Sequence, residues 1–263
     1  FFMESFMEHD FTSGSVWKKL LLFAVPIFGA NLLQALYGTV DLFVVGLFAD
    51  ASAVSAVSTG SMTMQTITGI ITGLTMGCTV LLGQNIGKKD EAAAERTVGS
   101  ALWLFVTVGI LLAVIVAVLA VGIASVINAP AEAFSQTTDY IRICGIGIIC
   151  IVMFNAIGGM FRGLGDARTP LALMGVACVV NIAGDFALVG ALKMGVAGAA
   201  LATVAVQGIL STFLVRIPVS YAMSKVSGVT LFQIGFATPL ATVFGIILSA
   251  SCVIYYERKR KKA

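Results

Sequence analysis

Several apolar stretches of this sequence are long enough to cross a lipid bilayer, and two of them each contain a single charged residue. Residues 20–48 contain only Asp41, and residues 170–192 contain only Asp185. The chain is 59% hydrophobic and 11% charged, whereas a soluble domain has about 25% charged residues. A membrane-spanning helix needs about 20 mainly apolar residues. The sequence therefore predicts an all-α protein, a polytopic bundle of membrane helices.

The apolar pattern predicts six spans before residue 209. They cover about residues 17–47, 53–83, 97–124, 138–161 and 170–190, and the sixth begins near Val196. Pro26 lies inside the first span and removes one helical hydrogen bond, so it predicts a kink that can act as a hinge. Thr169 is the expected N-cap of the fifth span, with Pro170 as its first helical residue.

Basic residues gather in alternate links between the spans. The links after the second and fourth spans contain Lys88, Lys89, Arg96, Arg162 and Arg168. The links after the first, third and fifth spans contain only Lys193. The positive-inside rule therefore predicts that the N-terminus and the basic links are cytoplasmic. The net charge of +3 gives no reason to expect a nucleic-acid partner.

The sequence offers no catalytic motif of a membrane enzyme. It has neither HExxH nor GxSxG, and its one histidine, His9, lies near the start of the chain. The five cysteines are scattered through apolar runs without a CxxC pair, which is typical of small buried residues. We expect neither enzymatic activity nor a bound cofactor.

Two acids and two neutral polar residues are predicted to meet in the outer half of the bundle. Asn181 lies one helical turn before Asp185, so the two side chains share a face. With a rise of about 1.5 Å per residue, Asp185 lies about 22 Å above the inner end of its span. Thr203 lies about 10 Å below the outer surface, and tilt brings Asp41 to a similar height. The first, fifth and sixth spans would then enclose one oxygen-lined pocket.

An acid within a membrane span is costly and usually functional. Carboxylates beside an amide suit a small hard cation, because such ions prefer oxygen ligands. Loss of water around the carboxylates equally favours uptake of a proton. The structural alternative is that Asp41 and Asp185 each make a hydrogen bond to a neighbouring helix. The residues alone do not decide between a metal cation and a proton.

The order of these features resembles the multidrug and toxic compound extrusion (MATE) transporters. The matching residues are Pro26, Asp41, GQNIGKKD at 83–90, RGLGDARTP at 162–170, Asn181 with Asp185, and GAALAT at 198–203. They are most similar to the prokaryotic branch with an acidic residue in the first helix. The resemblance covers about residues 15–208 and implies one six-helix lobe.

The remaining residues resemble the last two helices of the family's second lobe. The resemblance therefore implies four parts: a cytoplasmic N-terminus at 1–16, a six-helix lobe at 17–208, a remnant of the second lobe at 209–256 and a basic cytoplasmic tail at 257–263. Most of a second lobe would then be absent, as in a truncated or internally deleted member.

The resemblance also implies a function and a set of site residues. Family members exchange Na⁺ or H⁺ for bulky drugs, often cationic or amphipathic, across the plasma membrane of a bacterium or archaeon. Their cation-binding positions fall on Asp41, Asn181, Asp185 and Thr203 in this sequence. Candidates for drug contact are Gln34, Tyr37, Tyr140 and Asn155, for each of which packing between helices is the stronger interpretation.

Two alternatives to an active antiporter remain at this point. One is an inactive half-transporter, since a lone lobe lacks the partner against which it would move, unless it pairs with a second lobe. The other is a flippase of a related fold, for lipid-linked sugars. A flippase would be expected to place Arg or Lys in its cavity, whereas the candidates here are acidic. Besides drugs, membrane lipid is an expected partner.

Overall fold

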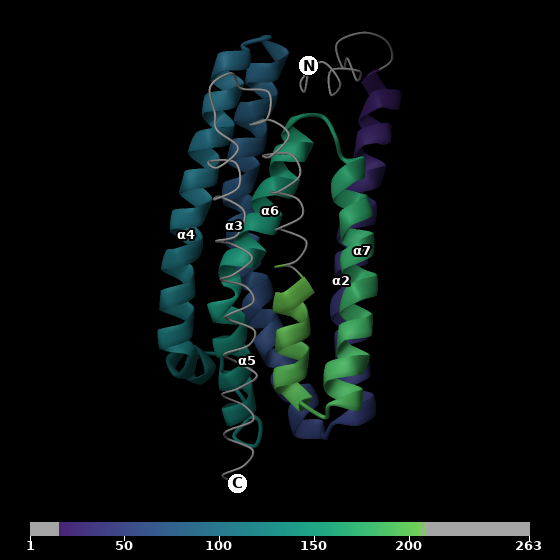
Figure 1. The fold of residues 1–263 in the computed structure, drawn as a ribbon, viewed down its shortest axis with the longest axis vertical. Helices are drawn as coiled ribbons and strands as arrows, with labels where there is room; N and C mark the ends of the chain where they lie inside the picture. Colours follow the sequence, from purple (N-terminus) through teal and green to yellow (C-terminus); the bar gives the residue numbers. More distant parts are fainter. Residues whose placement is uncertain (1–15, 207, 209–263) are drawn as a thin grey trace, which may run out of the picture.

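The computed structural model describes residues 16–206 and 208 of the chain, which form a bundle of long helices (Figure 1). The helices are α2 at Val16–Phe48, α3 at Ala51–Gly87, α4 at Glu91–Val126, α5 at Phe134–Ile146, α6 at Ile148–Gly163 and α7 at Arg168–Asp185. A π-helical stretch follows at Phe186–Ala191, and an apolar helix at Gly195–Val206 ends the described part. The predictions for the N-terminus, for the remnant at 209–256 and for the basic tail lie outside the described residues.

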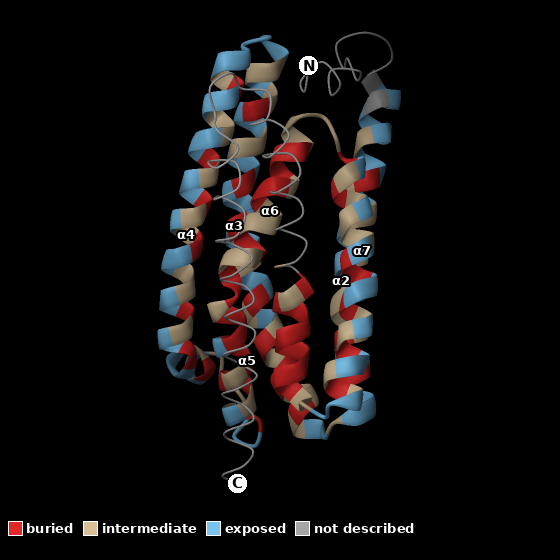
Figure 2. Ribbon diagram, viewed as in Figure 1, coloured by how far each residue is buried: buried red, intermediate tan, exposed pale blue. Residues whose placement is uncertain are grey.

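The exposed faces of these helices are apolar. Among the described residues, α2, α3, α4 and α7 with its π-helical extension are long and apolar enough to cross a membrane, and α5 with α6 makes a fifth span if the two count as one. Large side chains such as Phe43 and Trp103 are more than 60% exposed. Figure 2 shows exposed residues along the outer side of α4 and at the upper end of α2, and buried ones toward the middle of the bundle. Outward-facing apolar residues fit a lipid environment, so the predicted all-α membrane bundle is confirmed.

Small residues let the helices pack closely. The α3 helix packs against α5 and α6, α4 packs against the same pair, and α2 packs against α7. A methyl group added to Gly60 of α3 would overlap the ring of Tyr140, and one added to Gly159 of α6 would overlap Thr75. Close approach at glycine is a common way to join helices in lipid, where the hydrophobic effect does not hold helices together.

Substitution of Gly60 by alanine tests this packing. We expect Gly60→Ala to destabilise the bundle by about 1–3 kcal/mol, because the added methyl group must displace the Tyr140 ring from a close-packed site. Gly69→Ala is the matched control on the same helix, since nothing lies within 4 Å of the added methyl group. Unfolding of both variants in detergent micelles, followed by circular dichroism, measures the difference. Equal stability of the two variants would contradict the close contact.

The predicted span at 138–161 is a bent pair of helices rather than one straight helix. The α5 and α6 helices meet at Gly147 with a bend of 54°. A methyl group at Gly147 would overlap Val204, which belongs to the Gly195–Val206 helix. The absence of a side chain at the bend therefore gives that helix room to pass close to it.

The predicted cap of the fifth span is wrong. The α7 helix begins at Arg168, so Thr169 and Pro170 both lie inside its first turn. The carboxylate of Asp166 accepts hydrogen bonds from the backbone amides of Arg168 and Thr169, at 2.9 and 3.0 Å. An aspartate just before a helix satisfies its free amides as well as a threonine does. The N-cap position is therefore Ala167, two residues earlier than the sequence pattern indicated, and the carboxylate of the preceding Asp166 satisfies the free amides.

The up-and-down order of the helices sorts the charged links. The start of α2, the link between α3 and α4, and the link between α6 and α7 all lie at the upper end in Figure 1. We call it the basic end, because it carries Lys18, Lys88, Lys89, Arg162 and Arg168. Lys193 lies in the link at the opposite end. The cytoplasmic assignment of the basic end stays a prediction.

Candidate cation-binding site

Three helices bring the four predicted polar residues into one buried cluster. Asp41 belongs to α2, Asn181 and Asp185 belong to α7, and Thr203 belongs to the Gly195–Val206 helix. Asn181 and Asp185 have no exposed surface, and Asp41 and Thr203 are 3% and 8% exposed. We call Asp41, Asn181, Asp185 and Thr203 the acid cluster.

The path of the chain explains how the cluster forms. The α2 helix packs along α7, which places Asp41 beside the end of α7. Gly184 has no side chain, so Ala202 of the last described helix packs beside it and Thr203 comes next to α7. Directly after Asp185, the α-helix changes to the π-helix Phe186–Ala191. Such a change of hydrogen-bond register is rare and frequently marks functional sites.

The side chains of the cluster lie within range of one another. Asp41 interacts with the side chains of Asp185, Asn181 and Thr203. Tyr37, one helical turn before Asp41 on α2, also interacts with Asp41 and Thr203. Both carboxylates therefore share one environment, which is closed to solvent and bounded by three helices.

Most polar atoms of the cluster have no hydrogen-bond partner within ordinary geometric limits. These atoms are Asp41 Oδ1, both carboxylate oxygens of Asp185, both side-chain polar atoms of Asn181 and Thr203 Oγ1; the neighbouring Tyr37 hydroxyl also has no partner. Buried polar groups are normally hydrogen-bonded, and two close carboxylates repel each other strongly in a medium of low dielectric constant. The cluster therefore has the oxygen atoms and the charge that a small cation or a proton requires.

The donor set indicates which class of cation fits. Among the described residues, no group of three or more His, Cys, Asp or Glu side chains is arranged to hold a metal ion. The acid cluster supplies two carboxylates and neutral oxygens from Asn181 and Thr203, without a sulfur or imidazole ligand. Hard monovalent cations and protons match such a set better than transition metals do.

The structure separates the four residues that were predicted as drug contacts. Gln34 is exposed on α2, and the hydroxyl of Tyr37 lies at the acid cluster. Tyr140 is buried between α3 and α5, where its hydroxyl is 3.0 Å from Ser61 Oγ. The amide nitrogen of Asn155 donates to the Ile151 carbonyl of its own helix at 2.8 Å. Contact of these residues with a drug stays a prediction.

Sequence analysis overlooked one residue beside the acid cluster. Cys144 of α5 is fully buried and interacts with Tyr140 and with Asp41. Cys144 lies four residues after Tyr140, so helical spacing alone predicts that the two share a face. Pro26, the predicted hinge, is buried in α2, which continues as one helix from Val16 to Phe48.

Comparison with known proteins indicates the same family as the sequence motifs do. The model of the MatE family matches residues 26–187. A probable multidrug resistance protein of Bacillus subtilis, YpnP, is 30% identical over 201 residues, which are 76% of this chain and 45% of that protein. The probable multidrug resistance protein NorM of Thermotoga maritima is 28% identical over 191 residues, which are 71% of this chain and 41% of that protein. The chain thus spans about half the length of these curated relatives.

Solved structures share the fold. A transporter of the MOP superfamily from Pyrococcus furiosus superposes with a TM-score of 0.74 at 23% identity, over 91% of this chain and 53% of that one. An outward-facing multidrug resistance MATE transporter superposes with a TM-score of 0.72 at 23% identity, again over 91% of this chain and 53% of the other. Because the family model also matches well over half of the sequence, this chain belongs to the MatE family of MATE transporters.

Proposed function

We propose that the acid cluster binds the coupling cation of an antiporter that exchanges Na⁺ or H⁺ for small-molecule drugs. The observation that carries the proposal is the burial of two carboxylates, Asp41 and Asp185, beside the oxygens of Asn181 and Thr203, with most of these atoms lacking hydrogen bonds. The names of the relatives, multidrug resistance protein and multidrug export protein, support drugs as the cargo.

The cation acts by offsetting charge between two helices. Without a cation, Asp41 on α2 and Asp185 on α7 repel each other. The surrounding hydrocarbon raises the free energy of these buried charges further. One bound Na⁺ or proton removes one of the two negative charges and is shared by the pair, so the repulsion falls, α2 moves toward α7 and α2 bends at Pro26. Such a switch requires that the cation bind one arrangement of the helices more tightly than the other.

The charge of the cluster also selects the cargo. Two acids attract cationic or amphipathic drugs and repel anions. A flippase of lipid-linked sugars must instead bind a diphosphate, for which Arg or Lys would have to point into the same space. All four residues of the acid cluster are acidic or neutral, so the antiporter is the better-supported proposal.

Transport by a rocking motion requires two lobes that move relative to each other. Secondary transporters move one repeat against another around a fixed site. Because this chain spans about half the length of its relatives, we propose that its six-helix lobe pairs with a second lobe. The complex would lie in the plasma membrane with the basic end in the cytoplasm, as the positive-inside rule predicts.

Efflux in reconstituted vesicles tests the proposal. The purified chain is placed in vesicles loaded with ethidium, a cationic dye, and a Na⁺ or pH gradient is imposed. We expect gradient-driven dye movement that is lost in Asp185→Asn, because the amide cannot exchange a cation. Asp90→Asn is the control, since Asp90 is an exposed helix cap and asparagine also caps helices. Dye movement that Asp185→Asn leaves unchanged would refute coupling through the acid cluster.

A further inference from the structure

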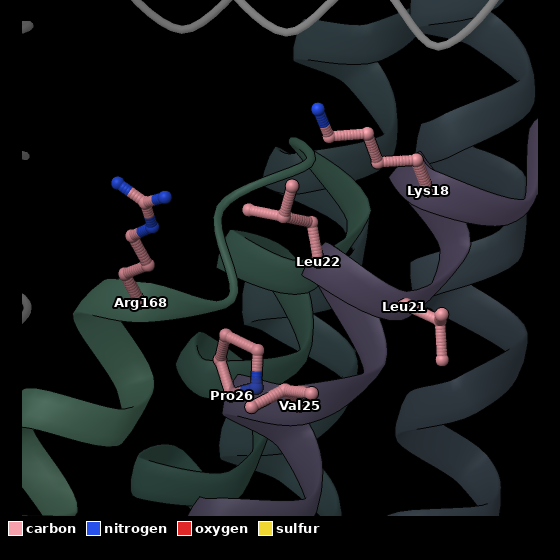
Figure 3. A pocket seen from close by; sticks show the side chains of 6 residues that line it. All are labelled: Lys18, Leu21, Leu22, Val25, Pro26 and Arg168. Atoms are coloured by element: carbon pink, nitrogen blue, oxygen red, sulfur yellow. The ribbon is translucent and has the colours of Figure 1, made fainter. Parts of the chain in front are cut away.

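A pocket with two cationic side chains lies at the basic end of the bundle, away from the acid cluster. It has a volume of about 450 Å³ and is lined by Lys18, Leu21, Leu22, Val25, Pro26 and Arg168. The first five belong to the N-terminal turns of α2, and Arg168 is the first residue of α7. Figure 3 shows Lys18 and Arg168 on either side of Leu22, with the Pro26 ring below them.

The two cationic side chains of this pocket are accessible to a ligand. The side chains of Lys18 and Arg168 are both exposed. The acid nearest to Arg168 along the chain is Asp166, whose Oδ1 already accepts the amides of Arg168 and Thr169. Arginine presents a planar fork of donors that matches phosphate oxygens, and lysine adds a second, compact charge.

The rest of the pocket is apolar and open. Leu21, Leu22 and Val25 are each at least half exposed, and they lie beneath the two cations together with the Pro26 ring. A ligand that satisfies both parts must carry a negative charge at one end and hydrocarbon at the other. The volume lies within the usual range of about 300–1,000 Å³ for small-molecule sites.

We propose that this pocket binds an anionic phospholipid, with the phosphate between Lys18 and Arg168 and the start of an acyl chain against Leu21, Leu22 and Val25. Basic pockets between membrane helices are well suited to anionic headgroups. A cationic drug is disfavoured there by charge. The bound lipid joins α2 to α7, the two helices that carry Asp41 and Asp185. The inference does not depend on the proposed transport function, because it concerns another ligand and rests on Lys18 and Arg168, which are not part of the acid cluster.

Lipid retention by the purified chain tests the assignment. The chain is extracted from vesicles that contain equal amounts of dioleoylphosphatidylglycerol and dioleoylphosphatidylcholine, and bound lipid is measured by native mass spectrometry. We expect preferential retention of the phosphatidylglycerol. The double variant Lys18→Gln with Arg168→Gln should reduce it, by about five-fold for each charge removed.

A matched pair of substitutions distinguishes lipid binding in this pocket from nonspecific attraction of anionic lipid to the basic end. Lys88→Gln with Lys89→Gln removes the same charge from the same end, but neither lysine lines the pocket. Retention should stay at the level of the unmodified chain in this control. Equal losses in the two double variants, or no preference for the anionic lipid in the unmodified chain, would overturn the proposal. Circular dichroism of each variant shows whether its helices are intact.

One rival occupant comes from the chain itself. Residues 1–15 contain three acids, Glu4, Glu8 and Asp10. If this segment filled the pocket, phosphatidylglycerol would bind only after Glu4→Gln, Glu8→Gln and Asp10→Asn were introduced together. That result would overturn the lipid assignment, whereas unchanged retention in the triple variant would support it.

Discussion

Replacement of either buried acid by asparagine should lower the affinity for the coupling cation at least about 100-fold. Asp41→Asn and Asp185→Asn each remove one charge from a cluster that is closed to solvent. Two unit charges 4 Å apart attract by about 4 kcal/mol even at an effective dielectric constant of 20, and each 1.4 kcal/mol corresponds to a tenfold change in affinity. Equilibrium binding of ²²Na⁺ and uptake of protons, both by the purified chain in lipid nanodiscs, give the two affinities.

The size and shape of asparagine make these variants informative. Asparagine fills nearly the same volume as aspartate, so the helices should remain packed. Asp50→Asn provides a control, because Asp50 is an exposed residue that caps α3 through the amide of Ala53 at 3.0 Å. If Asp50→Asn weakened cation binding as much as the two buried substitutions, the loss would not report on the acid cluster.

Removal of the Thr203 hydroxyl should separate Na⁺ from H⁺. A bound Na⁺ needs neutral oxygens in addition to the carboxylates, whereas a proton needs only one carboxylate oxygen. Thr203→Val keeps the shape of the side chain and removes a buried oxygen that has no hydrogen-bond partner. We therefore expect about a tenfold loss of Na⁺ affinity and at most about a twofold change in proton uptake.

The control for this substitution is a threonine of similar burial. Thr138 of α5 is 7% exposed, against 8% for Thr203, and its hydroxyl donates to the Phe134 carbonyl of its own helix at 2.9 Å. Thr138→Val should leave both affinities unchanged. A Na⁺ affinity that Thr203→Val does not alter would exclude Thr203 as a ligand, and the cluster would then be a proton site or a Na⁺ site with other ligands.

The helices and the acid cluster were predictable because each depends on local spacing. Apolar runs of more than 20 residues define the spans, and a separation of four residues places Asn181 and Asp185 on one face. The height of a residue along its helix follows from the rise per residue, which brought Thr203 to the level of the acids. The structure places these residues together in one buried site.

The bend at Gly147 was not predictable, because its cause lies elsewhere in the chain. Several glycines interrupt the apolar run around it, and nothing local distinguishes Gly147 from Gly145. The contact with Val204 becomes visible only when the Gly195–Val206 helix is in place. The π-helix after Asp185 escaped prediction for a related reason, since an apolar pattern does not specify the hydrogen-bond register.

Local sequence rules did not determine which residue caps α7 or which way the Tyr37 side chain of α2 points. Asp166 and Thr169 are both good caps, and only the path of the backbone shows that the Asp166 carboxylate reaches the free amides. Tyr37 lies one turn before Asp41, so its spacing already favoured a place beside the acids. The sequence pattern alone did not show whether the Tyr37 side chain faces the acids or a drug cavity.

The number of cations bound per chain tests the central claim most directly, namely that Asp41 and Asp185 form one shared site. Titration of the purified chain in nanodiscs with Na⁺ and with protons gives this number for the unmodified protein, for Asp41→Asn, for Asp185→Asn and for the double variant. A shared site predicts one cation per chain, with affinity weakened to a similar extent in the two single variants and binding at this site abolished in the double variant. Two cations that bind independently, each removed only by its own substitution, would contradict the account.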